Sequence, residues 1–373
     1  MTKPKIFAVR TARIIPTFCF ASLLLAACSG PGTSSSAANG GSGANGTGGT
    51  ASAGGAGSTD FVANPGVCDA GKCNGKCLAA GETAGGCKFI GNIGSITLAA
   101  AQDGTLYSTW YDNVYELTLA PPSERKIEAS SMVNSFSELA VSATQVFAGS
   151  AATGDGLVAY GRPGDAKTVL DATASDVAEM QIVGDTVYYQ VEDFLGGAIK
   201  SVTATSTAPT TVIAGNNDIL GLYVDSTHVY WSQETANSNF MHIEATLQRA
   251  PLGDLTKPEV LATATTAEHI VGNDTTLFWT SDAQVFTLPK AGGTPVQVAL
   301  AGSHIQVGCA TSAGVIVFQK APTTEQLGRL LLVDATGKWK KIADISAADD
   351  FIVSGGRLYV EQANVGLYEV TLP

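Results

Sequence analysis

Residues 221–233 read Gly221-Leu222-Tyr223-Val224-Asp225-Ser226-Thr227-His228-Val229-Tyr230-Trp231-Ser232-Gln233. Both ends of this stretch are rich in β-branched and aromatic residues, whereas its middle is polar and typical of a tight turn. This order predicts two strands joined by a hairpin. A loop is expected next at 234–245, then a third strand at 247–252 and a fourth at 259–262. The stretch as a whole predicts one four-stranded antiparallel sheet.

The same arrangement recurs along the chain, and a hydrophobic pair at the start of the second strand marks each copy. The first and last pairs lie 252 residues apart in six steps, a mean period of 42 residues. Four strands in each period of about 40–45 residues are typical of a β-propeller blade. Without helical periodicity, residues 88–373 are predicted to be an all-β propeller of seven four-stranded blades. The pairs are Leu106-Tyr107, Val146-Phe147, Val187-Tyr188, Val229-Tyr230, Leu277-Phe278, Val315-Ile316 and Leu358-Tyr359.

The last repeat is incomplete, because the chain stops at Pro373 after a third strand. An open sheet edge of this kind invites pairing with another chain. Residues 88–93, which precede the first repeat, have a strand-like pattern and no place in it. We expect this segment to pair into the seventh blade as its outer strand and so close the ring.

The first 27 residues have the order of a bacterial export signal. Four basic residues open the segment, and an apolar stretch follows at 14–25. That stretch is too short for a membrane span, which needs about 20 apolar residues. Residues 1–27 are therefore predicted to be a signal peptide rather than part of the fold.

The end of this segment, Leu25-Ala26-Ala27-Cys28, resembles the lipobox of bacterial lipoproteins. The resemblance implies cleavage before Cys28 and acyl chains on that residue. Several chains on one residue anchor a protein stably, where a single chain is marginal. Ser29, in place of Asp, implies the outer membrane as the destination. An ordinary secretory signal followed by an incidental cysteine is the alternative.

Residues 28–59 are predicted to be a flexible linker, because Gly, Ser, Ala, Thr and Asn dominate their composition. Removing residues 1–27, which hold four basic and no acidic residues, takes the net charge from −12 to −16. A chain this acidic is repelled by phosphate groups, so no nucleic-acid partner is expected. The acidity suits a solvated surface or a cationic partner.

Four cysteines cluster in residues 60–87, which form a predicted Cys-rich segment. In an exported protein this clustering predicts two disulfides, whose pairing the sequence leaves open. A zinc site is the alternative, although the spacing lacks paired C-x2-C motifs. Cys309 remains in an apolar strand and is expected to be a buried, unreactive thiol. The clustered cysteines are Cys68, Cys73, Cys77 and Cys87.

Two second strands, Val229-Tyr230-Trp231-Ser232 and Leu277-Phe278-Trp279-Thr280, look like the YWTD-type blades of lipoprotein-receptor ectodomains. The later stretches 247–254 and 287–293 resemble hairpins of propeller domains in secreted bacterial lipoproteins. The resemblance implies binding or scaffolding outside the cytoplasm and no specific ligand. We expect a monomer that is anchored to the outer membrane by lipid and binds a protein or carbohydrate partner.

Polar residues start several of the predicted first strands, which surround the central channel of a propeller. Their side chains are expected near one mouth of this channel. Two imidazoles with carboxylates could hold a divalent metal or supply a base, whereas solvated strand starts are the ordinary explanation. No other cofactor is expected, and no catalytic residue is assigned because no catalytic motif is present. The candidate metal ligands are Glu138, Glu179, His269, His304 and Asp350.

Aromatic residues in loops of the same face are candidates for recognition, since loops on a rigid scaffold often carry function. They could equally cover the channel mouth. The leading hypothesis is a binding or scaffold module. The alternatives are a propeller-type enzyme, such as a metal-dependent lactonase, another hydrolase or a glycan lyase, and a purely structural envelope protein. The binding-face candidates are Trp110, Tyr111, Phe240, Met241 and His242.

Overall fold

The computed structural model describes Val62 and residues 71–373, apart from 75, 94–96, 111–112, 130–135, 151–155, 192–196, 215–217, 237–242, 264–265, 282–283, 301–303 and 363–364. All of them belong to one compact unit, Ala53–Pro373. Every element in this part of the chain is a strand. Accordingly, the described residues contain no long apolar helix that could cross a bilayer. Residues 1–59, which hold the predicted signal peptide, Cys28 and the linker, lie outside the described residues.

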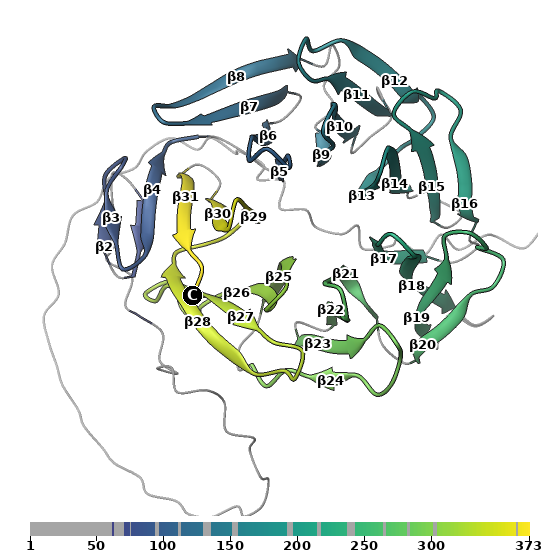
Figure 1. Cartoon of the computed structure of the whole chain (residues 1–373). Helices are drawn as coiled ribbons and strands as arrows, with labels where there is room; N and C mark the ends of the chain where they lie inside the picture. The colour runs from purple at the N-terminus through teal and green to yellow at the C-terminus, as the bar shows by residue number, and fades with distance from the viewer. Residues whose placement is uncertain are drawn as a thin grey trace, which may run out of the picture. The chain divides into compact units, whose positions relative to one another are not determined.

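Seven antiparallel sheets are arranged around a common centre, which confirms the predicted seven-bladed propeller (Figure 1). Blade one is β5 (Thr97–Ala100), β6 (Leu106–Trp110), β7 (Asn113–Leu119) and β8 (Pro122–Ala129). Blade two is β9 (Phe136–Val141), β10 (Gln145–Ser150), β11 (Leu157–Gly161) and β12 (Lys167–Asp171). Blade three is β13 (Val177–Val183), β14 (Thr186–Val191), β15 (Ala198–Thr203) and β16 (Thr210–Ala214). Blade four is β17 (Asp218–Val224), β18 (His228–Ala236), β19 (Ile243–Pro251) and β20 (Glu259–Thr263).

The last three blades follow the same order from the centre outward. Blade five is β21 (Glu268–Gly272), β22 (Thr276–Ser281), β23 (Gln284–Pro289) and β24 (Val296–Gln297). Blade six is β25 (Ile305–Thr311), β26 (Gly314–Gln319), β27 (Gly328–Val333) and β28 (Trp339–Ile345), extended by β1 (Gly71–Cys73) and β2 (Lys76–Leu78). Blade seven is β29 (Asp350–Ser354), β30 (Arg357–Gln362), β31 (Gly366–Thr371), β4 (Cys87–Gly91) and β3 (Thr83–Ala84).

The innermost strands form a closed ring around the channel. β5, β9, β13, β17, β21 and β25 each contact the innermost strand of the next blade, and β29 contacts β5. Residues at the same position of these strands therefore approach one another across the channel, although they lie far apart in the sequence. This ring determines where the candidate site forms.

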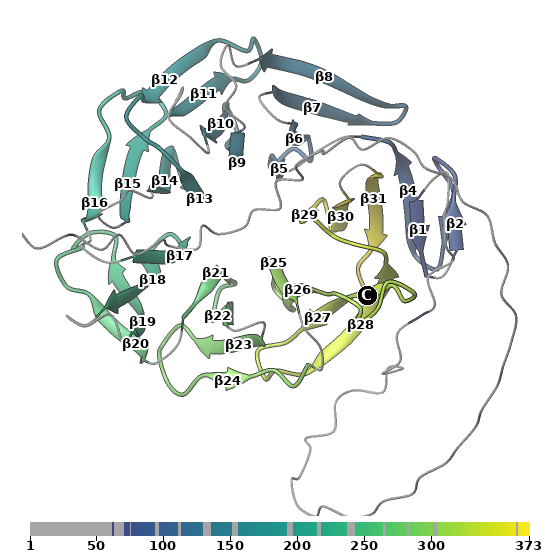
Figure 2. The ribbon, with the colours of Figure 1, turned by 180° about the vertical axis from the view of Figure 1, so that it is seen from behind.

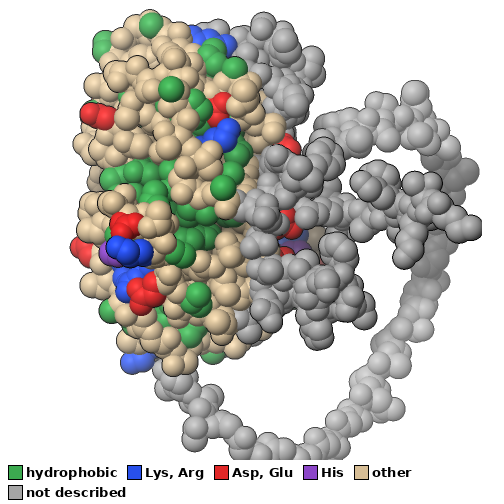
Figure 3. Space-filling view, turned by 90° about the vertical axis from the view of Figure 1, so that its right-hand side faces the viewer, with side chains coloured by type: hydrophobic (Ala, Val, Ile, Leu, Met, Phe, Trp, Pro, Cys, Tyr) green, Lys and Arg blue, Asp and Glu red, His purple; other side chains and the backbone are tan. Residues whose placement is uncertain are grey.

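The hydrophobic pairs of the repeats form the core between the blades. Thirteen of their fourteen side chains are buried, and only Tyr188 is half-buried. Both neighbours of a pair can be buried because each sheet packs against another blade on each of its two faces. The face turned to the viewer in Figure 3 has a band of hydrophobic side chains, with acidic and basic side chains gathered beside it.

The seventh blade is closed as predicted. Strand β4 pairs with β31 in antiparallel register, with Phe89 opposite Tyr368 and Gly91 opposite Leu367. Phe89 and Ile90 are each 1% exposed. Burying a side chain of this size contributes about 1.5–3 kcal/mol, so the closing strand adds core as well as hydrogen bonds. The two ends of the repeat region thus meet in one sheet.

The Cys-rich segment is built into the propeller rather than folded beside it. Strand β1 pairs with the outer strand of blade six at Cys73 and Ile345, and Figure 2 shows β1 and β2 next to β4. Asn74 strengthens this junction, because its N–H donates to the Asp344 carbonyl at 2.7 Å and its side-chain oxygen accepts from the Asp344 N–H at 2.8 Å. The predicted Cys-rich segment ends at residue 87, and the predicted propeller starts at residue 88. Strand β4 begins at Cys87 and continues across this position.

A disulfide joins Cys73 to Cys87, with the two Cα atoms 6.3 Å apart. It therefore links the extension of blade six to the closing strand of blade seven. Cys77 is also disulfide-bonded, and Cys68 lies outside the described residues. Cys309 is free. Its side chain is half-buried, and burial raises the pKa of its thiol to about 12, which disfavours the reactive thiolate.

The prediction of a long loop at 234–245 in blade four is wrong. Strand β18 continues to Ala236 and β19 already begins at Ile243. The two strands remain paired over this length, with Glu234 opposite Ala245 and Ala236 opposite Ile243. The prediction failed because the sequence shows no alternation of apolar and polar residues here. The backbone hydrogen bonds of a two-stranded ribbon do not require such an alternation.

Candidate functional site at the channel mouth

Four polar side chains from four different blades meet at the channel mouth. Glu138 lies on β9 of blade two and Glu179 on β13 of blade three. His269 lies on β21 of blade five and Asp350 begins β29 of blade seven. The innermost strands hold all four, so the ring of blades brings together residues that are up to 212 positions apart.

Direct and electrostatic contacts link these four groups into a circuit. His269 Nδ1 lies 3.5 Å from Glu179 Oε1. The negative charges of Glu179 and Asp350 both act on the Glu138 carboxyl. The imidazole of His269 in turn acts on Asp350.

Two of the carboxylates also hold neighbouring blades together. Glu179 Oε2 accepts a hydrogen bond from the Leu222 N–H on β17 of blade four. Asp350 Oδ2 accepts from the Leu98 N–H on β5 of blade one at 2.6 Å, and its Oδ1 accepts from the Phe351 N–H at 2.7 Å. These acceptor positions are charge-assisted and therefore strong.

The pKa values of two carboxyl groups are raised. Burial raises the pKa of Glu138 well above its usual 4.5, and the negative charges of Glu179 and Asp350 raise it further. Burial also raises the pKa of Asp350 to about 6, although the hydrogen bonds from Leu98 and Phe351 oppose this effect. Both side chains keep partial contact with water in the channel. Carboxyl groups whose pKa values are raised by burial and like charges are common at functional sites.

The local backbone aims His269 into the mouth. Its φ angle is +48°, a left-handed conformation that non-glycine residues rarely adopt, and it lies in a β-bulge between Glu268 and Val271. Bulges often redirect a side chain near a functional site. His304 has a φ of +61° and is exposed. The contacts of the described residues do not bring the His304 side chain to the other four, so the structure gathers four of the five candidates.

The arrangement does not support the metal hypothesis. Among the described residues, no group of three or more His, Cys, Asp or Glu side chains is placed to hold a metal ion. The physical reason lies in their contacts, because Glu179 and Asp350 already accept backbone N–H groups and His269 lies beside Glu179. We therefore treat the cluster as a set of titratable groups.

Only one of the predicted binding-face residues lies within the described chain. Trp110 ends β6 and is half-buried, and its carbonyl accepts a hydrogen bond from the Asn113 side chain at 3.3 Å. Tyr111, Phe240, Met241 and His242 lie outside the described residues. Their role in recognition stays a prediction.

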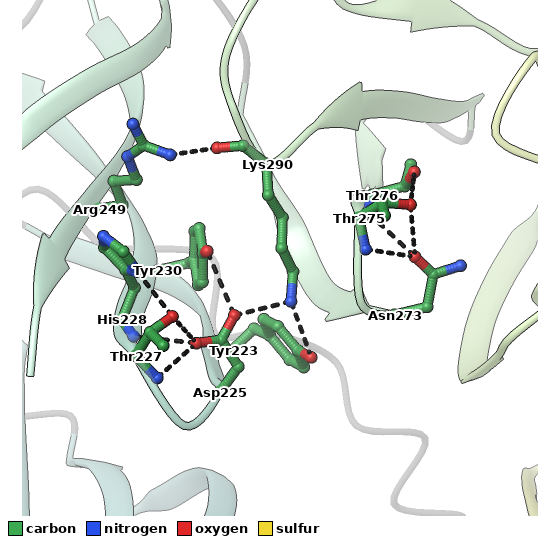
Figure 4. Close-up of polar contacts among 10 residues, drawn as sticks. All are labelled: Tyr223, Asp225, Thr227, His228, Tyr230, Arg249, Asn273, Thr275, Thr276 and Lys290. Carbon is green, nitrogen blue, oxygen red and sulfur yellow. Dashed lines mark hydrogen bonds and ion pairs between the residues drawn. The ribbon is translucent and has the colours of Figure 1, made fainter.

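The sequence reasoning missed a set of contacts that join blades four and five at the rim (Figure 4). Lys290 Nζ donates to Asp225 Oδ2 at 2.7 Å and lies 4.8 Å from the ring centre of Tyr223 and 5.5 Å from that of Tyr230. Burial alone would raise the pKa of Asp225, but the hydrogen bonds from Lys290, Thr227 and His228 together hold it well below its usual range. Cation–π contacts of this kind add stability when the cation is partly desolvated.

An equivalent contact joins blades one and two. Arg162 donates to the Tyr107 hydroxyl at 2.6 Å and to Asp103 Oδ2 at 2.9 Å. In both cases a basic residue directly after the third strand reaches an Asp in the first hairpin of the preceding blade. This spacing is visible in the sequence, but it is informative only once the register of the repeats is known.

No protein-family model matches the sequence, and no curated protein matches it. Solved structures do match. A chain of the mitotic checkpoint complex is 12% identical with a TM-score of 0.57, covering 74% of this chain and 87% of that chain. The tricorn protease is 10% identical with a TM-score of 0.56, covering 78% of this chain and 34% of that chain. The extracellular domain of a putative hybrid two-component system from B. thetaiotaomicron is 11% identical with a TM-score of 0.53, covering 83% of this chain and 39% of that chain. At these identities the likeness shows the fold alone.

Proposed function

We propose that this chain is an exported, lipid-anchored binding module whose channel mouth receives a protein or carbohydrate partner. The observation that carries the proposal is the Glu138 carboxyl, whose pKa is raised by burial and by the negative charges of Glu179 and Asp350. Such a group costs folding free energy at neutral pH, because burial and two like charges oppose its ionisation. Residues that reduce stability in this way are typical of functional sites.

The closed ring supports the same proposal. Strand β4 and the Cys73–Cys87 disulfide join the two ends of the repeat region, so the mouth is built on fixed strands. Binding constellations on rigid elements lose little conformational entropy when a partner arrives. A propeller whose four mouth side chains come from four blades presents them in a constant geometry.

A glycan array probed with the purified full chain tests the carbohydrate arm of this proposal, and a panel of purified envelope proteins tests the protein arm. The two mouth variants are Glu138→Gln and His269→Asn. Asparagine is chosen at position 269 because it tolerates the left-handed backbone there. Glu325→Gln, at an exposed site, is the matched control. We expect the bound partner to be lost in both mouth variants and kept in the control. Binding that survives both variants would contradict the assignment of the mouth.

The lipid anchor is tested separately with Cys28→Ser in the host cell. The lipobox-like stretch Leu25-Ala26-Ala27-Cys28 supports acylation of this residue. Without acyl chains the protein is expected to leave the membrane fraction and appear in the soluble fraction. A variant that stays in the membrane fraction as fully as the unchanged chain would contradict the anchor.

A second candidate function is glycan cleavage at the mouth by acid–base chemistry. The raised pKa of Glu138 favours it, because a carboxyl with a raised pKa can act as a general acid while a neighbouring carboxylate stays ionised. Incubation of the full chain with the glycans that it binds, followed by product analysis, separates the two functions. Products that appear with the unchanged chain and not with Glu138→Gln would indicate an enzyme. Glycans that stay intact would support the binding module instead.

A further inference from the structure

We propose that His269 and Glu179 form a proton-dependent latch across the channel mouth, which ties blade five to blade three when the imidazole is protonated. The two side chains come from β21 and β13, and His269 Nδ1 lies 3.5 Å from Glu179 Oε1. Blade four lies between these two blades in the ring, so the contact passes over one whole blade. The inference goes beyond the proposed function, because it concerns how the mouth is held and not what enters it.

The backbone of both strands is irregular where it carries the two side chains. Glu179 and His269 each lie in a β-bulge, within residues 177–180 of blade three and 268–271 of blade five. Each residue also precedes the first residue of the hydrophobic pair of its repeat by eight positions. His269 has in addition a φ of +48°, a conformation that costs free energy in a non-glycine residue. Bulges and strain of this kind are typical of positions where a side chain is aimed for a function.

Neutral contacts already join the neighbouring blades, and they show what the latch adds. Gln190 Nε2 donates to the Ile219 carbonyl at 2.7 Å between blades three and four. Ser232 Oγ donates to the Ala267 carbonyl at 2.5 Å between blades four and five. Neither contact carries a titratable group, and neither links blade three to blade five. The latch therefore adds a restraint that depends on pH to junctions that do not.

Glu179 is placed to be the fixed half of the latch. Its Oε2 accepts a hydrogen bond from the Leu222 N–H of blade four, and its side chain is only 13% exposed. Its Oε1 is buried and accepts no hydrogen bond from the described residues, so this oxygen is open to an imidazolium. The His269 side chain is 59% exposed and can exchange its proton with water. Histidine is the side chain that ordinarily changes its charge between pH 5 and 8.

The charge on His269 decides the strength of the contact. A protonated imidazole attracts the Glu179 carboxylate, whereas a neutral imidazole carries no net charge to do so. The stability that the latch contributes is therefore present in acid and is lost as the pH rises through the titration of the imidazole. Among the described residues, the other charged side chains at the mouth ends of the surrounding strands are acidic, and β22 and β25 carry none. The acidic residues are Glu268 on β21, Asp218 on β17, Glu234 on β18 and, across the channel, Glu138 on β9 and Asp350 on β29.

A double-mutant cycle at two pH values tests the proposal on the purified full chain. The cycle compares the unchanged chain, His269→Asn, Glu179→Gln and the double variant in denaturant titrations. Glutamine keeps an acceptor for the Leu222 N–H, and asparagine tolerates the left-handed backbone at position 269. At about pH 5.5 we expect a coupling of about two- to five-fold in the unfolding equilibrium constant, as for other partly exposed ion pairs. At about pH 8.5, where an ordinary imidazole is neutral, we expect no coupling.

A second cycle, with His228→Asn in place of His269→Asn, is the matched control. The His228 ring contacts Thr227 at 2.8 Å in the first hairpin of blade four, so this cycle should show no coupling to Glu179 at either pH. Glu179→Asp, which keeps the charge but withdraws it by one methylene group, carries the same test if the glutamine variant does not fold. Equal coupling of His269 and Glu179 at both pH values, or none at the acid pH, would overturn the latch. No partner takes part in this measurement, so its failure and that of the proposed function are distinguishable.

Discussion

Cys73 and Cys87 are bonded to each other although they extend different blades. Cys73 lies on β1, which pairs with the outer strand of blade six, and Cys87 begins β4, which closes blade seven. The disulfide therefore fixes the closing strand to the neighbouring blade as well as to its own sheet. Ring closure depends on this region because the last repeat supplies only three strands of its own.

We expect loss of this disulfide to destabilise the propeller. The bond closes a loop with a sequence separation of 14, for which the chain-entropy account gives a stabilisation of about 3 kcal/mol. Cys73→Ser combined with Cys87→Ser should lower the free energy of unfolding by about 2–4 kcal/mol in denaturant titrations. Cys309→Ser, which removes a free thiol, serves as the control. Equal stability of the double variant and the control would show that β4 holds without the bond.

Lys290→Met is expected to weaken the contact between blades four and five. The change removes the ion pair with Asp225 and the cation–π contact with Tyr223, and it leaves a carboxylate that is only 19% exposed. A loss of about 1–3 kcal/mol in the free energy of unfolding should follow. Lys257→Met is the matched control, because its pair with Asp254 is exposed and should contribute under about 0.5 kcal/mol. Similar losses in both variants would refute a specific role for Lys290.

Stability in acid should depend on Asp171. Burial would raise the pKa of this carboxyl, but hydrogen bonds from Thr173, Tyr189 and Lys200 outweigh burial and lower it to about 2. A depressed folded pKa contributes stability above the unfolded value of 3.8, and this is lost as the pH falls toward about 2. The contribution is about 2 kcal/mol. Asp171→Asn should be less stable at neutral pH and should lose less stability between pH 4 and about 2 in melting experiments. An unchanged acid slope would contradict this account.

The inner ring should not tolerate a side chain at position 308. A Cβ atom on Gly308 would lie 1.9 Å from the Phe351 ring of the next blade, so the two strands must move apart. Gly308→Ala should cost about 1–3 kcal/mol, and adding Phe351→Leu should restore part of the loss. At Gly253 a Cβ atom meets nothing within 4 Å, so Gly253→Ala is the control. A neutral Gly308→Ala would mean that the inner strands pack less tightly than described.

The repeat pattern predicted the fold because its signal is local and recurs seven times. Pairs such as Val229-Tyr230 are buried in six of the seven blades, and the incomplete seventh repeat pointed to the closing strand before blade one. The attachment of β1 to blade six was not predictable in this way. It depends on a pairing between Cys73 and Ile345, 272 residues apart, in a segment without apolar alternation.

The candidate site was predicted in part for the same reason. Counting back from the second-strand pairs locates Glu138, Glu179, His269 and Asp350 on innermost strands, and the ring then brings them together. His304 breaks the count, and the structure does not bring it to the cluster. The use of Glu179 and Asp350 as acceptors for the next blade depends on how neighbouring strands are offset, which one sequence does not show.

The most direct measurement is a carboxyl-carbon NMR titration of the full chain, with Glu138→Gln used to assign the Glu138 signal. The account predicts that the Glu138 signal titrates well above pH 4.5. The Asp350 signal should titrate near pH 6, because burial raises the pKa of this carboxyl. A Glu138 midpoint near 4.5 would show that neither burial nor the neighbouring carboxylates raise its pKa, and would contradict the central claim.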